Sequence, residues 1–499
     1  MRTCFKAVIF LFCFATPLLA QNSTNNLKPS WWSKFLYLSG NAADPAPGTT
    51  TSIIAGTNVD VSNECGPQSE TFIATNSAHP QNLAGGANEI FRNPMRGYSS
   101  GDGGSSWTGV DLPLPASNGA NSSDFGSDPT LAFDSQGNLF YGYIVVFFGN
   151  GKQNGVNGTE MAVARSTDGG RSYPGVSFFS FATGSDHFND KPMITADANP
   201  GSPFRDSVYI AWDAASGGSS NGGIRFGRSA DSAQTFTVTR IDDPNGPGQS
   251  IGAVPFVGPK GEVYVAWNDL ASDTITFNRS FDGGVTFGSP SVVATKNLTL
   301  QSNIPAELFR GALVYPACDA DRSNGPHRGR LYCSWMDSNS TGNTDIFMAF
   351  SDNQGATWSA PVTVADPLHN VDRFNQWMAV DPVTGDVNFS FYDTRNDTTG
   401  SRFQTDIFFT QSVNGGASFS SPNTRVTTVS SNEHDCNGVF PCAGVNLGDQ
   451  QGDYEGLTSF GGVSHPIWTD SRLNLTASSG CRTNLLMEEV FTATVGRTK

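Results

Sequence analysis

Short apolar runs bounded by Gly, Asn, Asp or Ser recur along the chain, and they predict β-strands. Each run spans roughly four to eight residues, which suits a strand and is too short for a typical helix. One set of similar runs (VYIAWD, VYVAWND, LYCSWMD and VNFSFYD among them) begins at Asn138, Val208, Val263, Leu331, Val387 and His465, with a poorer copy at Asn82. This set predicts seven equivalent strands.

A second set of runs follows the first and also numbers seven, from MRGYSS at Met95 to VFTATV at Val490. Six of these runs lead into one turn motif, Ser-x-Asp-x-Gly-x-Ser/Thr-aromatic, which begins at Ser100, Ser166, Ser229, Ser280, Ser351 and Ser412. In such a turn Asp or Asn accepts backbone N–H groups, Gly takes a positive φ, and the aromatic residue anchors the next strand. Six copies at spacings of 51 to 71 residues indicate a repeated four-stranded unit.

The counts predict an all-β fold, a single seven-bladed β-propeller over residues 51–499, with six blades as the alternative. The seventh unit lacks the turn motif and a fourth strand of its own. The extended stretch from Thr51 to Val61 can supply that strand. Pairing the two ends of the chain in one blade would close the ring and remove exposed sheet edges.

The turn motif resembles the Asp box, or bacterial neuraminidase repeat, of the sialidase superfamily, and the match covers nearly all of residues 51–499. The resemblance implies that the boxes join the third and fourth strands of each blade, at the rim away from the substrate, and are structural. It also implies a glycan as the partner, either bound or hydrolysed. Catalytic sialidases have six blades, so a count of seven puts direct transfer of their activity in doubt.

The first 20 residues resemble a secretory signal, with Arg2 and Lys6 ahead of an apolar run and the small residue Ala20 at its end. We therefore expect cleavage after Ala20, an N-terminal extension over residues 21–50, and a secreted or extracytoplasmic monomer. No later apolar run is long enough to span a membrane. The formal net charge of −16 disfavours nucleic acid and anionic membranes as partners, because both require basic patches.

Six cysteines follow the signal, and an even number in an exported chain predicts disulfides. Their places among the predicted strands indicate three pairs: Cys65–Cys481, Cys318–Cys333 and Cys436–Cys442. The first pair would lock the closure of the ring, the second would cross-link two strands of the fifth blade, and the third would staple the loop before the seventh blade.

Candidate chemistry lies where the innermost strands begin, since the loops of a propeller converge there on the mouth of the central channel. The residues at these positions are Glu70, Asp128, Asp190, Lys191, Arg310, Arg373, Asn375, Asp449, Asp453, Tyr454 and Glu455. A second ring, at the ends of the second strands, comprises Asp213, Asp269, Asp337, Asp393 with Arg395, and Asp470 with Arg472. For this second ring we favour turn capping and local ion pairs over a functional role.

The sialidase resemblance assigns roles to some of the mouth residues. Tyr454 would be the nucleophile, activated by Glu70, and Asp128 would be the acid/base. Further substrate contacts would come from an arginine clamp and neighbouring polar groups: Arg310, Arg373, Lys191, Asp190, Asn375 and Asp453. Two features depart from the family: Phe91-Arg92-Asn93-Pro94 stands just before a box instead of well upstream, and a third arginine is missing.

Carboxylates outnumber cations at the predicted mouth, six (Glu70, Asp128, Asp190, Asp449, Asp453, Glu455) to three (Lys191, Arg310, Arg373). Because sialic acid is itself an anion, this balance predicts weak or absent sialidase activity and favours a neutral sugar. Three hypotheses remain open: a glycan-binding or glycan-hydrolysing protein, a true sialidase, and a non-catalytic interaction scaffold. We expect no cofactor, with calcium at Asp449, Asp453 and Glu455 as a weaker alternative.

Overall fold

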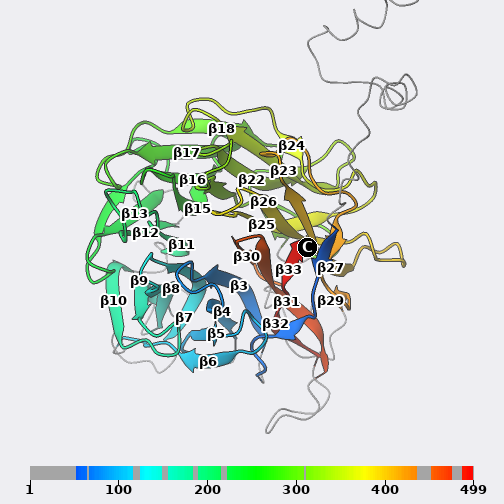
Figure 1. Ribbon diagram of the computed structural model, residues 1–499, viewed down its shortest axis with the longest axis horizontal. Helices are drawn as coiled ribbons and strands as arrows, with labels where there is room; N and C mark the ends of the chain where they lie inside the picture. The colour runs from blue at the N-terminus through cyan, green and yellow to red at the C-terminus, as the bar shows by residue number, and fades with distance from the viewer. Residues whose placement is uncertain are drawn as a thin grey trace, which may run out of the picture. The chain divides into compact units, whose positions relative to one another are not determined.

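In the computed structural model of the chain, the described residues are 52–64, 67–90, 92–115, 124–148, 156–183, 189–214, 222–307, 311–434, 451–474 and 486–497. The regular elements among them are β-strands, arranged as seven antiparallel sheets around a central axis (Figure 1). None of the described segments forms a helix that could cross a bilayer. The predicted all-β, seven-bladed propeller is confirmed.

Blades one to three follow each other along the chain, each with four strands. Blade one contains β3(Gln68–Thr75), β4(Leu83–Glu89), β5(Arg96–Ser100) and β6(Thr108–Asp111). Blade two contains β7(Phe125–Phe133), β8(Leu139–Phe148), β9(Val156–Ser166) and β10(Gly175–Thr183). Blade three contains β11(Asp190–Ala196), β12(Val208–Asp213), β13(Ile224–Ser229) and β14(Thr237–Arg240). The first strand of each blade is innermost, and each packs against the first strand of the next blade.

Blades four to six repeat this order. Blade four contains β15(Ser250–Val257), β16(Val263–Asp269), β17(Thr274–Ser280) and β18(Ser291–Thr295). Blade five contains β21(Ala317–Ala320), β22(Leu331–Ser338), β23(Thr344–Ser351) and β24(Val362–Thr363). Blade six contains β25(Arg373–Val380), β26(Val387–Asp393), β27(Gln404–Ser412) and β28(Thr424–Arg425). Two short additions accompany them: β19(Gln301–Ser302) pairs with β20(Ala312–Leu313), and β29(Ser431–Asn432) pairs with β27.

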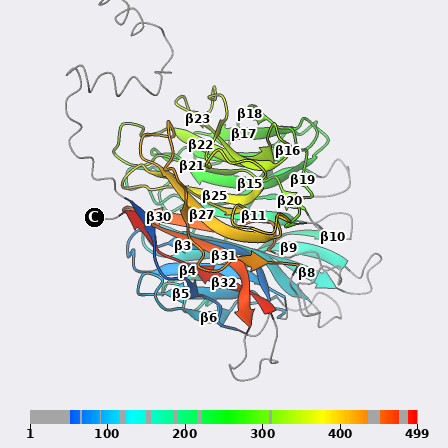
Figure 2. The ribbon, with the colours of Figure 1, turned by 90° about the vertical axis from the view of Figure 1, so that its right-hand side faces the viewer.

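The seventh blade contains both ends of the described chain. It is built from β30(Gly456–Phe460), β31(Val463–Asn474) and β32(Leu486–Thr492), with β33(Val495–Arg497), β1(Ile53–Ala55) and β2(Val59–Asp60) added to it. Ile53 lies opposite Arg497, and Val59 lies opposite Thr492. The N-terminal strands therefore close the ring as the sequence predicts, and Figure 2 shows blue and red strands in one blade.

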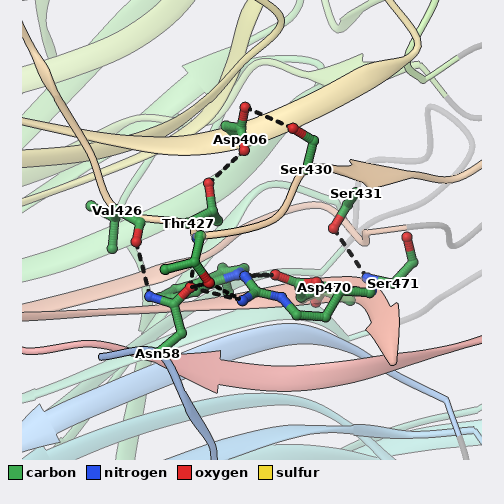
Figure 3. Close-up of polar contacts among 12 residues, drawn as sticks. Asn58, Asp406, Val426, Thr427, Ser430, Ser431, Asp470 and Ser471 are labelled. Carbon is green, nitrogen blue, oxygen red and sulfur yellow. Dashed lines mark hydrogen bonds and ion pairs between the residues drawn. The ribbon is translucent and has the colours of Figure 1, made fainter. Parts of the chain in front are cut away.

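A polar network fixes this closure to the neighbouring blade (Figure 3). The Asn58 side chain, between β1 and β2, donates to the carbonyl oxygen of Val426 at 2.9 Å and accepts from the Thr428 N–H at 2.8 Å. Arg472 of the seventh blade donates to the same Asn58 oxygen at 2.8 Å and also bonds Asp470. One side chain thus ties the N-terminal strands to blades six and seven.

The core and the turns follow the two repeated sequence patterns. The second strands bury an equivalent tryptophan in four blades: Trp212, Trp267, Trp335 and Trp468. The Asp boxes are self-contained turns: in the first box, Asp102 accepts from the Ser106 hydroxyl and N–H and from Ser100. These donors lower the pKa of Asp102 to about 2. The boxes are therefore satisfied by their own residues, as a structural role requires.

One predicted disulfide lies in the described part of the chain and is confirmed. Cys318 on β21 and Cys333 on β22 are directly opposite each other, with an S–S distance of 2.09 Å. Cys65, Cys436, Cys442 and Cys481 lie outside the described residues, so the other two pairs stay predictions.

Candidate functional site

A β-bulge recurs near the start of five innermost strands and sets the positions of the site. The strand register shifts at Ser69/Phe72, Ser127/Thr130, Asp190/Met193, Ile251/Val254 and Phe374/Trp377. Inside each bulge one residue has a positive φ, between 45° and 70°: Glu70, Asp128, Lys191, Gly252 and Asn375. Four of the five are not glycine, although such residues seldom adopt this conformation. The sequence had singled out these same four.

Lys191 is the centre of the resulting cluster. Its ammonium group lies 2.8 Å from Glu70 Oε1 and also contacts Asp453, and the side chains of all three are at most 4% exposed. The ring centroid of Tyr454 is 4.8 Å from the Lys191 nitrogen, and that of Tyr315 is 5.6 Å away. Burial opposes the charge of Lys191, but Asp453, Glu70 and Asp128 together hold its pKa well above the usual value.

Asp128 and Asp190 form a carboxyl pair beside this lysine. Both accept the backbone N–H of Lys191, Asp128 at 3.2 Å and Asp190 at 3.1 Å, and the two side chains are hydrogen-bonded to each other. Burial raises the pKa of Asp128 to about 6 and also raises the pKa of Asp190, against the opposing effect of Lys191. The pair can therefore hold and exchange one proton near neutral pH.

Asn88 connects the two halves of the cluster. Its amide nitrogen donates to Glu70 Oε2 at 3.0 Å, while its oxygen accepts the backbone N–H of Asp128 at 2.7 Å. The Ser127 hydroxyl donates to Asp128 Oδ1 at 2.6 Å. The sequence patterns did not identify Asn88 and Tyr315 as site residues. Asn88 ends the poorest copy of the second-strand pattern, and that position was the signal that could have found it.

Tyr454 belongs to the cluster but is not paired with Glu70. Its hydroxyl donates to the carbonyl oxygen of Pro129 at 3.0 Å, and the residue is 2% exposed. Burial, together with Glu70 and Asp128, holds the pKa of Tyr454 well above its ordinary range. A neutral phenol bonded to a carbonyl is not an activated nucleophile. Tyr454 is therefore near Glu70 as predicted but is not held as a nucleophile that Glu70 activates.

Arg373 is not placed to clamp a substrate, and that prediction needs correction. The residue is 0% exposed, and its guanidinium donates to Asp393 at 2.8 Å, to Asp345 at 2.9 Å and to the carbonyl oxygen of Asp366 at 2.7 Å. These three acceptors engage the Arg373 guanidinium inside blade six. Arg310 and Asp449 lie outside the described residues.

Of the remaining predicted residues, Asn375 lies at the cluster, whereas Glu455 belongs to the interior of the propeller. Asn375 donates to the carbonyl oxygen of Gly452 at 2.9 Å, beside Glu70. Glu455 is turned into the interior, where it accepts from Tyr392 at 2.5 Å and from Thr71 at 2.7 Å. Among the residues that the structure describes, no group of three or more His, Cys, Asp or Glu side chains is arranged to hold a metal ion.

Most aspartates of the second ring, at the ends of the second strands, cap turns or form local ion pairs. Asp269 accepts the backbone N–H groups of Ala271 and Ser272, each at 3.0 Å. Asp337, Asp393 and Asp470 likewise accept nearby N–H groups, and the last two bond Arg395 and Arg472. Asp213 is the exception, because it is fully buried without such partners.

A cavity of about 540 Å³ occupies the channel beyond the cluster. All seven innermost strands line it, mainly with apolar side chains such as Phe72, Leu131, Met193, Val254 and Trp377. None of the five bulge residues lines it. The charged cluster and this apolar cavity are therefore separate features of the channel.

Comparison with known proteins gives likenesses of fold. No protein-family model and no curated protein matches the chain. Similar solved structures include the leech intramolecular trans-sialidase (13% identity, 72% of this chain and 68% of that one, TM-score 0.44). The NanB sialidase of Streptococcus pneumoniae is 11% identical over 70% of this chain and 68% of that one, with a TM-score of 0.45. An alpha-L-arabinofuranosidase of Fusarium graminearum is 12% identical over 72% of this chain and 98% of that one, with a TM-score of 0.44. Sialidases are thus among the structural neighbours, as the Asp boxes predict.

Proposed function

We propose that this sialidase-like propeller is an exported glycan-directed protein whose site is the cluster around Lys191 and whose ligand carries no carboxylate. One observation supports this most directly: Lys191, the cation of the cluster in the described part of the chain, is already paired with both Glu70 and Asp453. A carboxylate ligand would have to displace one of these partners inside a buried site. It would also meet Asp128 and Asp190, which lie beside Lys191.

The same cluster offers general acid/base chemistry for glycoside hydrolysis. Asp128 is the candidate acid because Asp190 shares its proton and burial raises its pKa to about 6. A group with this pKa is partly protonated at neutral pH and can protonate a leaving oxygen. Glu70 and Asp453 would remain as acceptors for sugar hydroxyls. Activity that depends on protonated Asp128 is expected to fall as the pH rises through about 6.

Strict sialidase activity is the second candidate, and the Asp boxes are what favour it. It requires free arginines at the mouth, whereas Arg373 is fully engaged in blade six. It also requires an activated tyrosine, whereas Tyr454 donates to Pro129. An interaction scaffold is the third candidate.

An assay of the mature protein on a fluorogenic sialoside and on a panel of neutral glycosides separates these candidates. We expect turnover of a neutral glycoside, a loss of at least about 100-fold in Asp128→Asn, and little sialoside turnover. Asp269→Asn is the matched control, since this aspartate caps a turn outside the cluster. Robust sialoside turnover that Tyr454→Phe abolishes would overturn the proposal, and an inactive protein that binds no glycan would favour the scaffold.

A further inference from the structure

Asp213 differs from the other aspartates at the ends of second strands. It ends β12, is 0% exposed, and neither of its carboxyl oxygens has a hydrogen-bond partner among the described residues. At the same ladder position of blade four, Asn268 donates to the carbonyl oxygens of Thr299 and Val314 at 3.0 and 2.9 Å. A buried carboxyl without a partner is costly, and a ligand that donates to it would offset that cost.

Asp213 faces the Lys191 cluster. It lies opposite Asp190 in the β11–β12 ladder, and directly opposite residues project from the same face of a sheet. Burial and the neighbouring Asp190 hold the pKa of Asp213 well above its usual value, while Lys191 acts in the other direction. Tyr315 also lies near Asp213, and the nearby backbone N–H of Gly252 acts to lower the pKa of Asp213.

A second buried acceptor lies on the same ring of bulges. Asn375 is 4% exposed, and its side-chain oxygen has no hydrogen-bond partner among the described residues, although its nitrogen bonds Gly452. Asp190 and Asp128 add two more acceptor groups beside Lys191. The oxygens of Asp213 and Asn375 are therefore buried acceptors that no described donor satisfies, and a group rich in donors would complete them.

We propose that the cluster recognises a protonated amino group on the sugar, so that the preferred ligand is an amino sugar with a free amine. This inference rests on the proposed function and narrows its ligand class. An ammonium group carries three donors, no acceptor and a positive charge, which match the unpaired oxygens of Asp213 and Asn375. An N-acetyl group carries one donor, one acceptor and no charge, and a hydroxyl carries no charge.

Calorimetric titration of the mature protein with glucosamine oligosaccharides and with their N-acetylated counterparts tests this inference. At a pH where the amines are protonated, we expect the free-amine sugar to bind at least about tenfold more tightly. Titration in two buffers of different ionisation enthalpy should show proton release, because Asp213 must ionise to pair with the ammonium. Asp213→Asn should remove both the preference and the proton release, and Asp269→Asn should retain them.

The possible outcomes separate the two proposals. Equal binding of both sugars, or a preference unchanged in a folded Asp213→Asn protein, overturns the amino-sugar inference and leaves the glycan site intact. Absence of binding by any glycan overturns the proposed function and this inference with it. Thermal melting of each variant establishes that it is folded, and proton release from the unaltered protein provides a readout if Asp213→Asn does not fold.

Discussion

Replacing Lys191 by methionine is expected to lower the free energy of unfolding by about 3 to 5 kcal/mol at pH 7. The ammonium group is buried and lies between Glu70 and Asp453, which come from blades one and seven. Without it, two carboxylates remain in a site with little solvent exposure. Removal of one partner from a buried ion pair costs more than the pair contributes, because the other charge is left uncompensated.

The loss should depend on pH with a definite sign. In the variant, Glu70 and Asp453 are buried carboxyl groups without their cation. Protonation removes the cost of burying their charge, so the deficit of the variant should shrink between pH 7 and pH 5. Urea denaturation at both pH values measures it. Lys260→Met, at an exposed lysine, is the control and should change stability by less than about 0.5 kcal/mol. A Lys191→Met protein as stable as the unaltered chain would contradict the account of the cluster.

Replacing Arg373 by methionine should produce a comparable loss, about 3 to 5 kcal/mol, through a different part of the molecule. Asp345 and Asp393 would each lose a buried cationic partner, and the carbonyl oxygen of Asp366 would lose a donor. The exposed Arg171→Met is the control. If Arg373 instead bound substrate, its replacement would weaken binding without this loss of stability. Denaturation and glycan titration of the same variant therefore distinguish a structural arginine from a ligand-binding one.

The sequence predicts the architecture well because the signals are local. Each strand copy and each Asp box is encoded within about ten residues, and the box carries its own hydrogen-bond partners, as Asp102 shows. The closure by residues 53–60 was also predictable, since one unit lacked a strand and one extended segment remained. The Cys318–Cys333 pair followed from the positions of the same strands.

The sequence predicted which positions belong to the site, but it did not predict which side chains contact one another there. Glu70, Asp128, Lys191 and Asn375 lie in the bulges of their strands, but no sequence pattern marks a bulge. Arg373 is only two residues before Asn375, yet it remains in the regular ladder opposite Asp393 and turns into the blade. The pairing of Lys191 with carboxylates from blades one and seven depends on closure of the ring, which no local pattern encodes.

The central claim is that the cluster around Lys191 is a glycan site from which carboxylate sugars are excluded. A glycan array probed with the mature protein and with Asp453→Ala tests it most directly, because binding is detected whether or not the protein is catalytic and Asp453 is a proposed acceptor for sugar hydroxyls. We predict binding confined to glycans without sialic or uronic acids, and weaker binding in a folded Asp453→Ala variant. Binding that is confined to sialylated glycans, or that persists unchanged in Asp453→Ala, would contradict the claim.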